Sequence, residues 1–326
     1  MNKEVKKMDM YQKRKVRAEK RKNSENEKDL SKVSISWFPG HMHKTMKQIE
    51  EDLKLVDIVI EILDARIPVS SRNPQVQKLI KNKKKIIVLN KEDLADKNES
   101  IKWANYFIKQ GDSAIICNAN TGEGSKKIKD EINKVMKEEY EKAAQKGRVG
   151  KTVRAMILGI PNVGKSSFIN RISTKNTMKV GNKPGVTTQK QWIRLADNIE
   201  LLDTPGVLWP KLDNEKVALN LAYTGTIKSD VIDEEEIAYN LTKLLLSDYE
   251  NNLINRYELN EQIVDKILQN EDIAENERIV EVMTYIGEKK NLLKKGGEVD
   301  FIRTSRTILE DFRSANLGRI TLERVK

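Results

Sequence analysis

Short, nearly continuous apolar runs alternate with helix-length segments through the first two thirds of the chain. The apolar runs are DIVIEIL (57–63), KIIVLN (85–90), AIIC (114–117), RAMILG (154–159) and IELLD (199–203). Runs of this kind are typical of strands buried on both faces of a sheet. The segments that separate several of them are 74–82, 99–110 and 125–146. This alternation predicts an α/β domain with a mostly parallel sheet and helices on both faces.

The pattern changes on both sides of this region. QWIRLA (191–196) and IELLD, joined by Asp197-Asn198, predict a hairpin at one edge of the sheet. Before the first run, apolar residues are spaced as on one helix face: Met42, Met46, Ile49 and Leu53. After residue 213 the strand signal ends and helical patterns such as EEEIAYNLTKLLLSDYE follow. We therefore expect an α/β domain over 34–212 and a small all-α domain over 213–326.

Length and composition are those of a globular protein. The chain has 326 residues, of which 38% are hydrophobic and 33% charged, enough for roughly two domains. Its one cysteine, Cys117, cannot form an internal disulfide, and no apolar run approaches the roughly 18 residues of a membrane span. The N-terminal residues lack the apolar core of a secretory signal. We expect a cytoplasmic monomer without membrane contact.

Positive charge is concentrated at the N-terminus. The chain carries 60 Lys and Arg against 49 Asp and Glu, a net charge of +11. Residues 1–33 alone hold twelve Lys and Arg, six Asp and Glu, and few residues that could form a core. This predicts a basic tail that is disordered when free and that favours a polyanionic partner. A tail that only keeps the chain in solution is an equal alternative.

The segment GIPNVGKS (159–166) matches the phosphate-loop pattern and stands between a predicted strand and the helical pattern SFINRI. In such loops backbone N–H groups surround the phosphates, the lysine contacts the β and γ phosphates, and the serine hydroxyl binds Mg²⁺. The predicted nucleotide-binding residues of this loop are Asn162, Val163, Gly164, Lys165, Ser166 and Ser167.

Two further segments predict the metal and γ-phosphate contacts. DTPG (203–206) ends the strand IELLD, so Asp203 would hold Mg²⁺ through water and the Gly206 amide would sense the γ-phosphate. The turn-rich segment GNKPGVTT (181–188) can order around a metal through a threonine hydroxyl. Thr187 is the preferred ligand, with Thr188 as the alternative.

NKED (90–93) stands at the carboxyl end of the predicted strand KIIVLN. A carboxylate there can accept both the N1–H and the exocyclic amine of guanine, whereas adenine offers no such pair of donors. NKED alone can be a polar turn, but its place at the end of a strand, with Asn118-Ala119 ending another strand, favours a guanine site. The predicted base-binding residues are Asn90, Lys91, Asp93, Asn118 and Ala119.

The guanine motif precedes the phosphate loop by about 70 residues, the reverse of the usual GTPase order, so the domain is circularly permuted. The chain resembles the permuted GTPases of the YlqF/YawG group through the motifs WFPGHM, LDARIP, NKED, GIPNVGKSS, PGVTT, LLDTPGVLWP and GEKK…GG. Residues 1–33 and the asparagine at position 118 depart from that pattern. The resemblance implies GTP hydrolysis, stimulated by ribosomal particles and coupled to a late step of large (50S) ribosomal subunit assembly. It also implies that the helical domain contacts ribosomal RNA.

The residue that orients the attacking water is not evident. Val207 follows the DTPG glycine, where Ras-type GTPases have a glutamine, and its side chain cannot hydrogen-bond water. The resemblance implies that His41 of WFPGH is the catalytic residue; an equal alternative is that His41 caps the following helix or touches RNA. Asn162 resembles the asparagine that accompanies K⁺ dependence, although it can also be a plain loop residue.

Basic residues near the C-terminus are candidate RNA contacts. On a helix over 301–313, three arginines share one side, next to an apolar arc of Phe301, Ile302, Ile308, Leu309 and Phe312. The predicted RNA-binding residues are Lys289, Lys290, Lys294, Arg303, Arg306 and Arg313. A solvated charged face is the alternative. Two other functions compete: a nucleotide kinase, which NKED disfavours, and an RNA-binding assembly scaffold with weak or vestigial nucleotide turnover.

Overall fold

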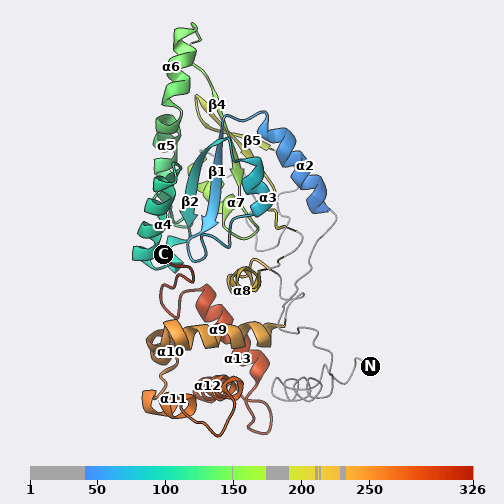
Figure 1. The fold of residues 1–326 in the computed structure, drawn as a ribbon, viewed down its shortest axis with the longest axis vertical. Coiled ribbons are helices and arrows are strands. Elements are labelled where there is room, and N and C mark those ends of the chain that lie inside the picture. Colours follow the sequence, from blue (N-terminus) through green and yellow to red (C-terminus); the bar gives the residue numbers. More distant parts are fainter. Residues whose placement is uncertain are drawn as a thin grey trace. The chain divides into compact units, whose positions relative to one another are not determined.

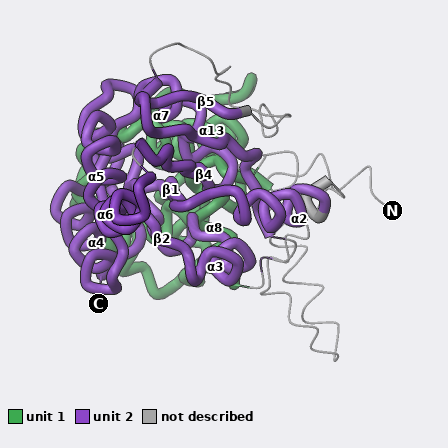
Figure 2. The backbone as a smooth tube through the Cα atoms, turned by 90° about the horizontal axis from the view of Figure 1, so that it is seen from above, with its two compact units in different colours: residues 1–35, 214–318 green, residues 36–213, 319–326 purple. Residues whose placement is uncertain are grey.

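The computed structural model of the protein describes residues 41–148, 150–173, 191–209, 212, 214–227 and 233–325. It divides into two compact units (Figure 2). Residues 36–213 and 319–326 form an α/β unit, and residues 214–318 form a helical unit. The chain thus leaves the α/β unit, forms the helical unit and returns. This differs from the expected boundary, which assigned all residues after 213 to the helical domain.

A six-stranded sheet forms the centre of the α/β unit (Figure 1). Its spatial order is β3-β2-β1-β4-β6-β5. The strands are β1 (Ile58–Asp64), β2 (Lys84–Asn90), β3 (Ser113–Ile116), β4 (Val153–Leu158), β5 (Gln191–Ala196) and β6 (Ile199–Asp203). All neighbours are parallel except β5 and β6, which form an antiparallel hairpin at the edge. The predicted parallel sheet and its edge hairpin are confirmed.

Helices lie on both sides of this sheet in Figures 1 and 2, with α4, α5 and α6 on one side and α2 and α3 on the other. The helices and 3₁₀ turns of the unit are α2 (His41–Leu53), α3 (Pro74–Leu79), η2 (Glu92–Leu94), α4 (Lys97–Lys109), η3 (Ser125–Lys127), α5 (Ile128–Val135), α6 (Lys137–Gln145) and α7 (Lys165–Ile172). The helix-length segment 125–146 forms a 3₁₀ turn and two helices, because the helix is interrupted at Met136. That residue is buried, whereas α6 has no buried residue and projects beyond the sheet.

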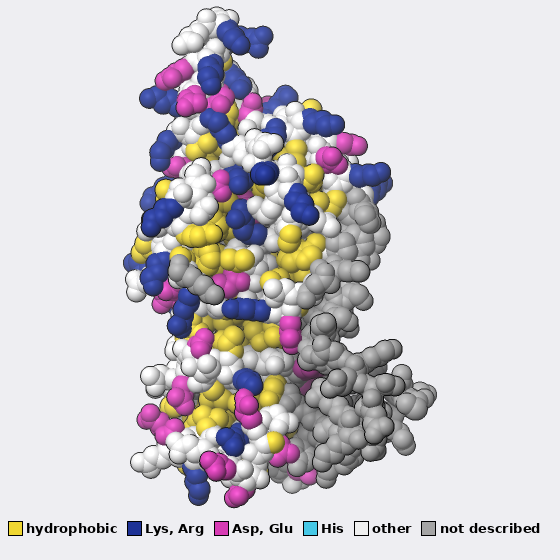
Figure 3. Space-filling view, in the orientation of Figure 1, with side chains coloured by type: hydrophobic (Ala, Val, Ile, Leu, Met, Phe, Trp, Pro, Cys, Tyr) yellow, Lys and Arg dark blue, Asp and Glu magenta, His cyan; other side chains and the backbone are white. Residues whose placement is uncertain are grey.

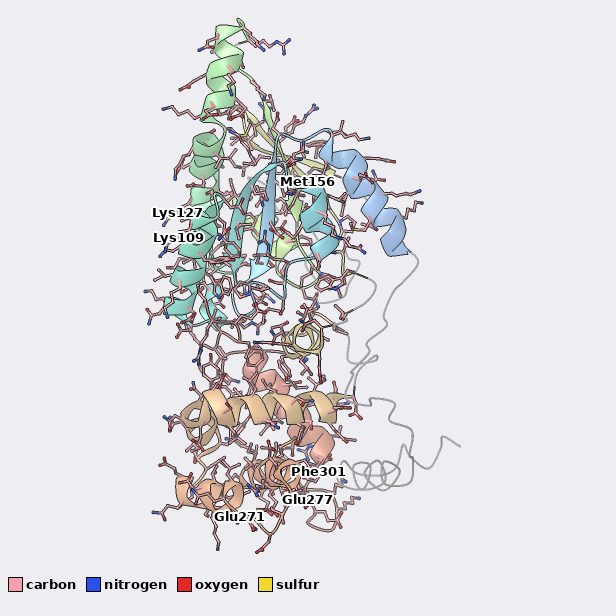
Figure 4. All side chains as sticks on the ribbon, in the orientation of Figure 1. Lys109, Lys127, Met156, Glu271, Glu277 and Phe301 are labelled. Atoms are coloured by element: carbon pink, nitrogen blue, oxygen red, sulfur yellow. The ribbon has the colours of Figure 1, made fainter. Side chains whose placement is uncertain are left out.

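The core of the α/β unit follows from the strand sequences. Every residue of β1 is buried, as expected for a strand covered on both faces. Trp103 and Phe107 of α4 pack against Leu63 of β1 and Leu89 of β2. Met156 of β4 lies in the middle of the sheet, while Lys109 and Lys127 point outward from the side formed by α4 and α5 (Figure 4).

The helical unit contains α8 (Glu215–Tyr223), α9 (Glu234–Asp248), α10 (Glu250–Tyr257), α11 (Glu261–Leu268), α12 (Glu275–Lys289) and α13 (Phe301–Arg313). The last helix packs against α8, α9 and α12. Its predicted apolar arc is confirmed for Ile308, Leu309 and Phe312, which are buried, but not for Ile302, which is 48% exposed. Among the described residues, no helix is long and apolar enough to cross a membrane.

Arg313 joins the last helix of this unit to the first. Its Nε donates to the carbonyl oxygen of Tyr223 and its Nη2 to that of Ala222, both at 2.9 Å. These carbonyls belong to the last turn of α8, where intrahelical donors are missing. The guanidinium of Arg313 therefore caps α8, and its Nε and Nη2 groups both donate to carbonyls inside the helical unit.

Replacing Arg313 by lysine keeps the positive charge but removes the fork that reaches two carbonyls at once. We expect Arg313→Lys to lower the free energy of unfolding of the helical unit by about 1–2 kcal/mol. Hydrogen exchange over residues 215–225 should rise accordingly. Arg303→Lys, at an exposed position of the same helix, is the matched control. Equal exchange in the two variants would contradict this cap.

Candidate functional site

The phosphate-loop segment connects β4 to α7, as its sequence context predicts. Lys165 is the first residue of α7 and Gly164 is its N-cap, with a left-handed φ of 93°. The backbone N–H groups of the first helical turn are thereby directed at the loop, an arrangement suited to a phosphate. Asn162 also has positive φ, 63°, which asparagine tolerates better than most residues. This conformation supplies a structural reason for asparagine at position 162.

The side chain of Lys165 folds back over the loop. It is 8% exposed, and its Nζ donates to the carbonyl oxygens of Gly159 at 3.0 Å and Ile160 at 3.1 Å. Burial lowers the pKa of Lys165 to about 8, and the nearby carboxylate of Asp203 opposes this shift. A Cβ on Gly206 would lie 2.8 Å from the same Nζ, so glycine allows the DTPG segment to approach the lysine. The phosphate loop and the DTPG segment therefore meet at Lys165.

Asp203 stands at the carboxyl end of β6, in register with Ile157 of β4. The hydroxyl of Thr204 donates to the carbonyl oxygen of Ile157 at 2.7 Å, which fixes the start of the segment after the strand. Asp203 is buried near Lys165, the neighbour of Ser166. A carboxylate and a hydroxyl are hard oxygen donors of the type that Mg²⁺ prefers, so these residues fit that ion. Thr187 and the rest of 181–188 lie outside the described residues.

Asn90 connects the guanine motif to both other loops of the site. Its Nδ2 donates to the carbonyl oxygen of Val163 at 2.8 Å, and its Oδ1 accepts from the backbone N of Ala119 at 3.0 Å. The side chain is buried, 2% exposed. A Cβ on Gly164 would collide with this amide, so the phosphate loop and Asn90 fit closely only because position 164 is glycine. Residues 90, 119 and 163–164 are thus joined in one hydrogen-bonded cluster.

Asp93 presents an acceptor that the rest of the described structure does not use. Its Oδ1 is buried and has no hydrogen-bond partner among the described residues. Buried polar atoms in folded proteins are nearly always paired, so an open acceptor indicates a missing donor. Burial, and secondly the nearby Asp93 carboxylate, raise the pKa of the Cys117 thiol to about 12. The backbone N of Glu92, next to Asp93, donates to the carbonyl oxygen of Cys117 at 3.3 Å. The N1–H and amine of a guanine are donors suited to this position.

The base-flanking segment is shaped by Asn118 and Arg171. The Oδ1 of Asn118 accepts from the backbone N atoms of Asn120 at 2.9 Å and Thr121 at 3.2 Å, closing a tight turn. Arg171 of α7 donates through Nε to the carbonyl oxygen of Ala119 at 3.3 Å and through Nη2 to that of Asn120. The backbone N of Ala119 is held by Asn90, so Asn90 and Asn118 fix the amides of this turn while Arg171 fixes its carbonyls.

Sequence reasoning did not assign roles to Asp64 and Arg66 of LDARIP. Both are buried, and Arg66 Nη2 lies 2.8 Å from Asp64 Oδ2, which also lies 3.0 Å from Lys91 Nζ. Although burial alone would raise it, the cations of Arg66 and Lys91 hold the pKa of Asp64 far below its usual range. Lys91 of the guanine motif, at a left-handed φ of 62°, is thereby anchored to β1. The sequence signal that could have identified Asp64 is its position, because it is an acidic residue at the end of a buried strand.

The histidine expected to position water and the valine that follows DTPG belong to other segments. His41 is the first residue of α2, and its side chain lies outside the described structure. Val207 is buried, and its carbonyl oxygen accepts from the Nδ2 of Asn73, the N-cap of α3, at 3.0 Å. This contact ties the segment after DTPG to the α/β unit.

The predicted RNA-binding residues all belong to the helical unit but differ in exposure. Lys289, Lys294 and Arg303 are exposed, and Arg306 is exposed but paired with Glu234 at 2.8 Å. Lys290 lies over the ring of Tyr257, and Arg313 caps α8. On the face in Figure 3, basic and acidic side chains are interspersed over this unit.

Comparisons with known proteins agree with this geometry. Residues 154–284 match the family described as "50S ribosome-binding GTPase". The chain is 43% identical over 289 residues to a ribosome biogenesis GTPase A of Bacillus cereus, covering 89% of this chain and 93% of the relative. It is 35% identical over 306 residues to a mitochondrial ribosome-associated GTPase 1 of Mus musculus, covering 88% and 90%.

Among solved structures, the chain is similar to GNP-bound YlqF from T. maritima, with a TM-score of 0.57 and 25% identity, covering 86% of this chain and 98% of that one. A GDP-bound YlqF structure gives a TM-score of 0.59 at 25% identity, covering 85% and 98%. The motif order along the chain is the permuted one, and the sheet brings the motifs together. The chain therefore belongs to the ribosome biogenesis GTPase A (YlqF) family of circularly permuted GTPases, and it hydrolyses GTP.

Proposed function

We propose that this GTPase binds immature large (50S) ribosomal subunits and couples GTP hydrolysis to a late step of their assembly. The observation that carries the nucleotide part is the Asn90 side chain, which bonds both Val163 of the phosphate loop and Ala119 of the base-flanking segment. Guanine lies against these loops, with Asp93 accepting from the N1–H and the exocyclic amine. Asn118 holds the turn that flanks the base, by accepting from the backbone N atoms of Asn120 and Thr121.

The phosphates bind at the start of α7. The backbone N–H groups of residues 162–167 surround them, and Lys165 exchanges its carbonyl partners for phosphate oxygens, which are stronger acceptors because they are charged. GTPase domains generally use Mg²⁺, and Ser166, Asp203 and Thr187 are the proposed ligands. When bound, the ion neutralises charge that develops on the phosphate oxygens. The Gly206 amide senses the γ-phosphate.

Hydrolysis requires a group that positions water, and Val207 lacks one. We assign that task to His41, which begins α2 directly after the WFPG segment. A bound K⁺ beside Asn162 would supply positive charge to the transition state. The left-handed conformation of Asn162 accounts for asparagine without K⁺, so the ion needs its own test.

The ribosomal part of the proposal is supported by the relatives' names and by the charge of the chain. The matched family is described as 50S ribosome-binding, and relatives are named for ribosome biogenesis or ribosome association. A net charge of +11 suits a polyanionic partner. The proposed RNA contacts are half-buried Lys290 and four exposed basic residues of the helical unit: Lys289, Lys294, Arg303 and Arg306. Arg313 is left to its structural contact with α8.

Exchanging Asp93 for asparagine tests the base assignment. An amide replaces one acceptor by a donor, so Asp93→Asn should lower the affinity for GDP by about 100-fold or more, the loss expected for two charge-assisted hydrogen bonds. Xanthosine diphosphate, which offers a carbonyl in place of the amine, should bind the variant better than GDP. Titration of both nucleotides against both proteins measures this. Unchanged preference for GDP would exclude the assignment.

Turnover with ribosomal particles tests catalysis. We expect His41→Ala to lower subunit-stimulated turnover by about 100-fold, within the range for loss of a general acid–base or water-positioning group, with GTP affinity unchanged. The same assay in KCl and NaCl tests the cation: turnover should be faster in KCl. Full stimulated turnover in His41→Ala would remove the histidine from the mechanism, and equal rates in the two salts would remove K⁺.

Co-sedimentation with mature and immature 50S subunits tests the partner. The protein should sediment with immature subunits in the presence of a non-hydrolysable GTP analogue and be released with GDP. Replacing Arg303 and Arg306 together by alanine should weaken binding and reduce its dependence on the logarithm of salt concentration by about two, one for each phosphate contact. Arg194→Ala, an exposed arginine of β5, is the control. Binding that does not respond to salt would indicate protein contacts instead.

A further inference from the structure

The last residues of the chain return to the α/β unit and lie along the guanine motif. We call residues 319–325 the C-terminal strap. The backbone N of Ile320 donates to the carbonyl oxygen of Leu94 at 3.2 Å. The backbone N of Asp96 donates to the hydroxyl of Thr321 at 3.0 Å, and Thr321 is fully buried. Arg319 pairs with Glu92 at 3.2 Å. The strap thus bonds three residues of the loop that contains Asp93.

A buried carboxylate anchors the other end of the strap. Glu323 is 9% exposed, and it accepts from the backbone N atoms of Val69 at 2.6 Å and Ser70 at 3.0 Å, and from the Ser70 hydroxyl. Its own carbonyl oxygen accepts from Trp103 Nε1 at 2.8 Å. Charge-assisted bonds of this kind are stronger than neutral ones, and burial makes their loss costly. These bonds therefore hold the strap firmly against the α/β unit.

Glu323 binds residues 69–70, which belong to the same segment as Asp64, the partner of Lys91. The backbone N of Leu322 donates to the carbonyl oxygen of Arg66 at 2.9 Å. Arg66 pairs with Asp64, and Asp64 pairs with Lys91. The strap therefore bonds the guanine motif directly at residues 92–96, and it bonds the segment that holds Lys91.

The strap is one of several supports of the guanine motif. Its first residue, Asn90, is fixed by the phosphate loop and the base-flanking segment, and residues 92–94 form a single 3₁₀ turn. The backbone N of Glu92 donates to the carbonyl oxygen of Cys117 at 3.3 Å, and Asp96 caps α4. The partners of Leu94 and Asp96 described above come from the strap. Asp93 is placed between these two supports. A shift of the loop by a fraction of an ångström would weaken hydrogen bonds to a base, because their strength depends on distance and angle.

We propose that residues 319–325 position the guanine-binding loop, so that the end of the chain sets the selectivity for the base. This rests on the proposed function, in which Asp93 accepts from guanine. Thr321 and Glu323 are positioning residues: they act through the loop and do not touch the nucleotide. A strap that only stabilises the unit would change the melting temperature without changing base selectivity.

The test compares GDP with inosine diphosphate, which lacks the exocyclic amine that Asp93 would bind. Thr321→Val and Glu323→Gln are made in the full chain, because both keep the shape of the side chain. In each we expect the ratio of the two affinities to fall by about threefold to tenfold, the loss of roughly one hydrogen bond to the base. Two variants keep the test valid if one of them does not fold.

Ile132→Val is the matched control, because Ile132 is buried in α5 of the same unit and contacts neither the strap nor the loop through any described hydrogen bond. It should lower the melting temperature and leave the ratio unchanged. An unchanged ratio in both strap variants, with a lowered melting temperature, overturns the proposal. Asp93→Asn separates the two hypotheses: if it loses the preference for GDP and the strap variants keep it, only the strap assignment fails. If Asp93→Asn also keeps it, both fail.

Discussion

The two hydrogen bonds of the Asn90 side chain are the contact on which the nucleotide site depends. One amide joins the end of β2 to the loop after β4 and to the turn after β3. The turn after β3 is about 30 residues from Asn90 along the chain and the loop after β4 about 70, yet this single buried side chain holds both at one edge of the sheet. Because the amide is buried, breaking either bond would leave a polar group unpaired, which resists separation of the loops.

Circular permutation changes the connections between these loops but not their positions. The guanine motif follows β2 and the phosphate loop follows β4, and these two parallel strands are separated only by β1. The two loops therefore lie at the same edge of the sheet, whichever comes first along the chain. What permutation changes is the continuation of the chain. The helical unit follows the DTPG segment, and it is followed in turn by the strap on the guanine motif. One of its connections therefore follows the DTPG segment, and the other continues into the strap that is bonded to the guanine motif.

The predictions from sequence were most successful where one local property decides the structure. Continuous apolar runs identified the strands, since burial on both faces requires them. The helix-length segment 125–146 is helical as expected, but its pattern does not show where the sheet ends; α5 packs on β2 and β3, while α6 extends beyond them. Arg313 looked like an RNA contact by its angle on α13, but the last carbonyls of α8 lie within its reach.

The sequence by itself determined the fold class and the permuted order of the motifs, and it predicted the residues that hold a guanine nucleotide, because these depend on short motifs and on the periodicity of apolar residues. Only the tertiary structure decided the rest. The sequence did not show that Asp64 is buried and paired with both Arg66 and Lys91. Nor did it show the path of residues 319–325, which depends on bonds to residues some 220 to 250 positions earlier. Such contacts depend on which loops the folded sheet brings together, and no local pattern in the chain encodes that.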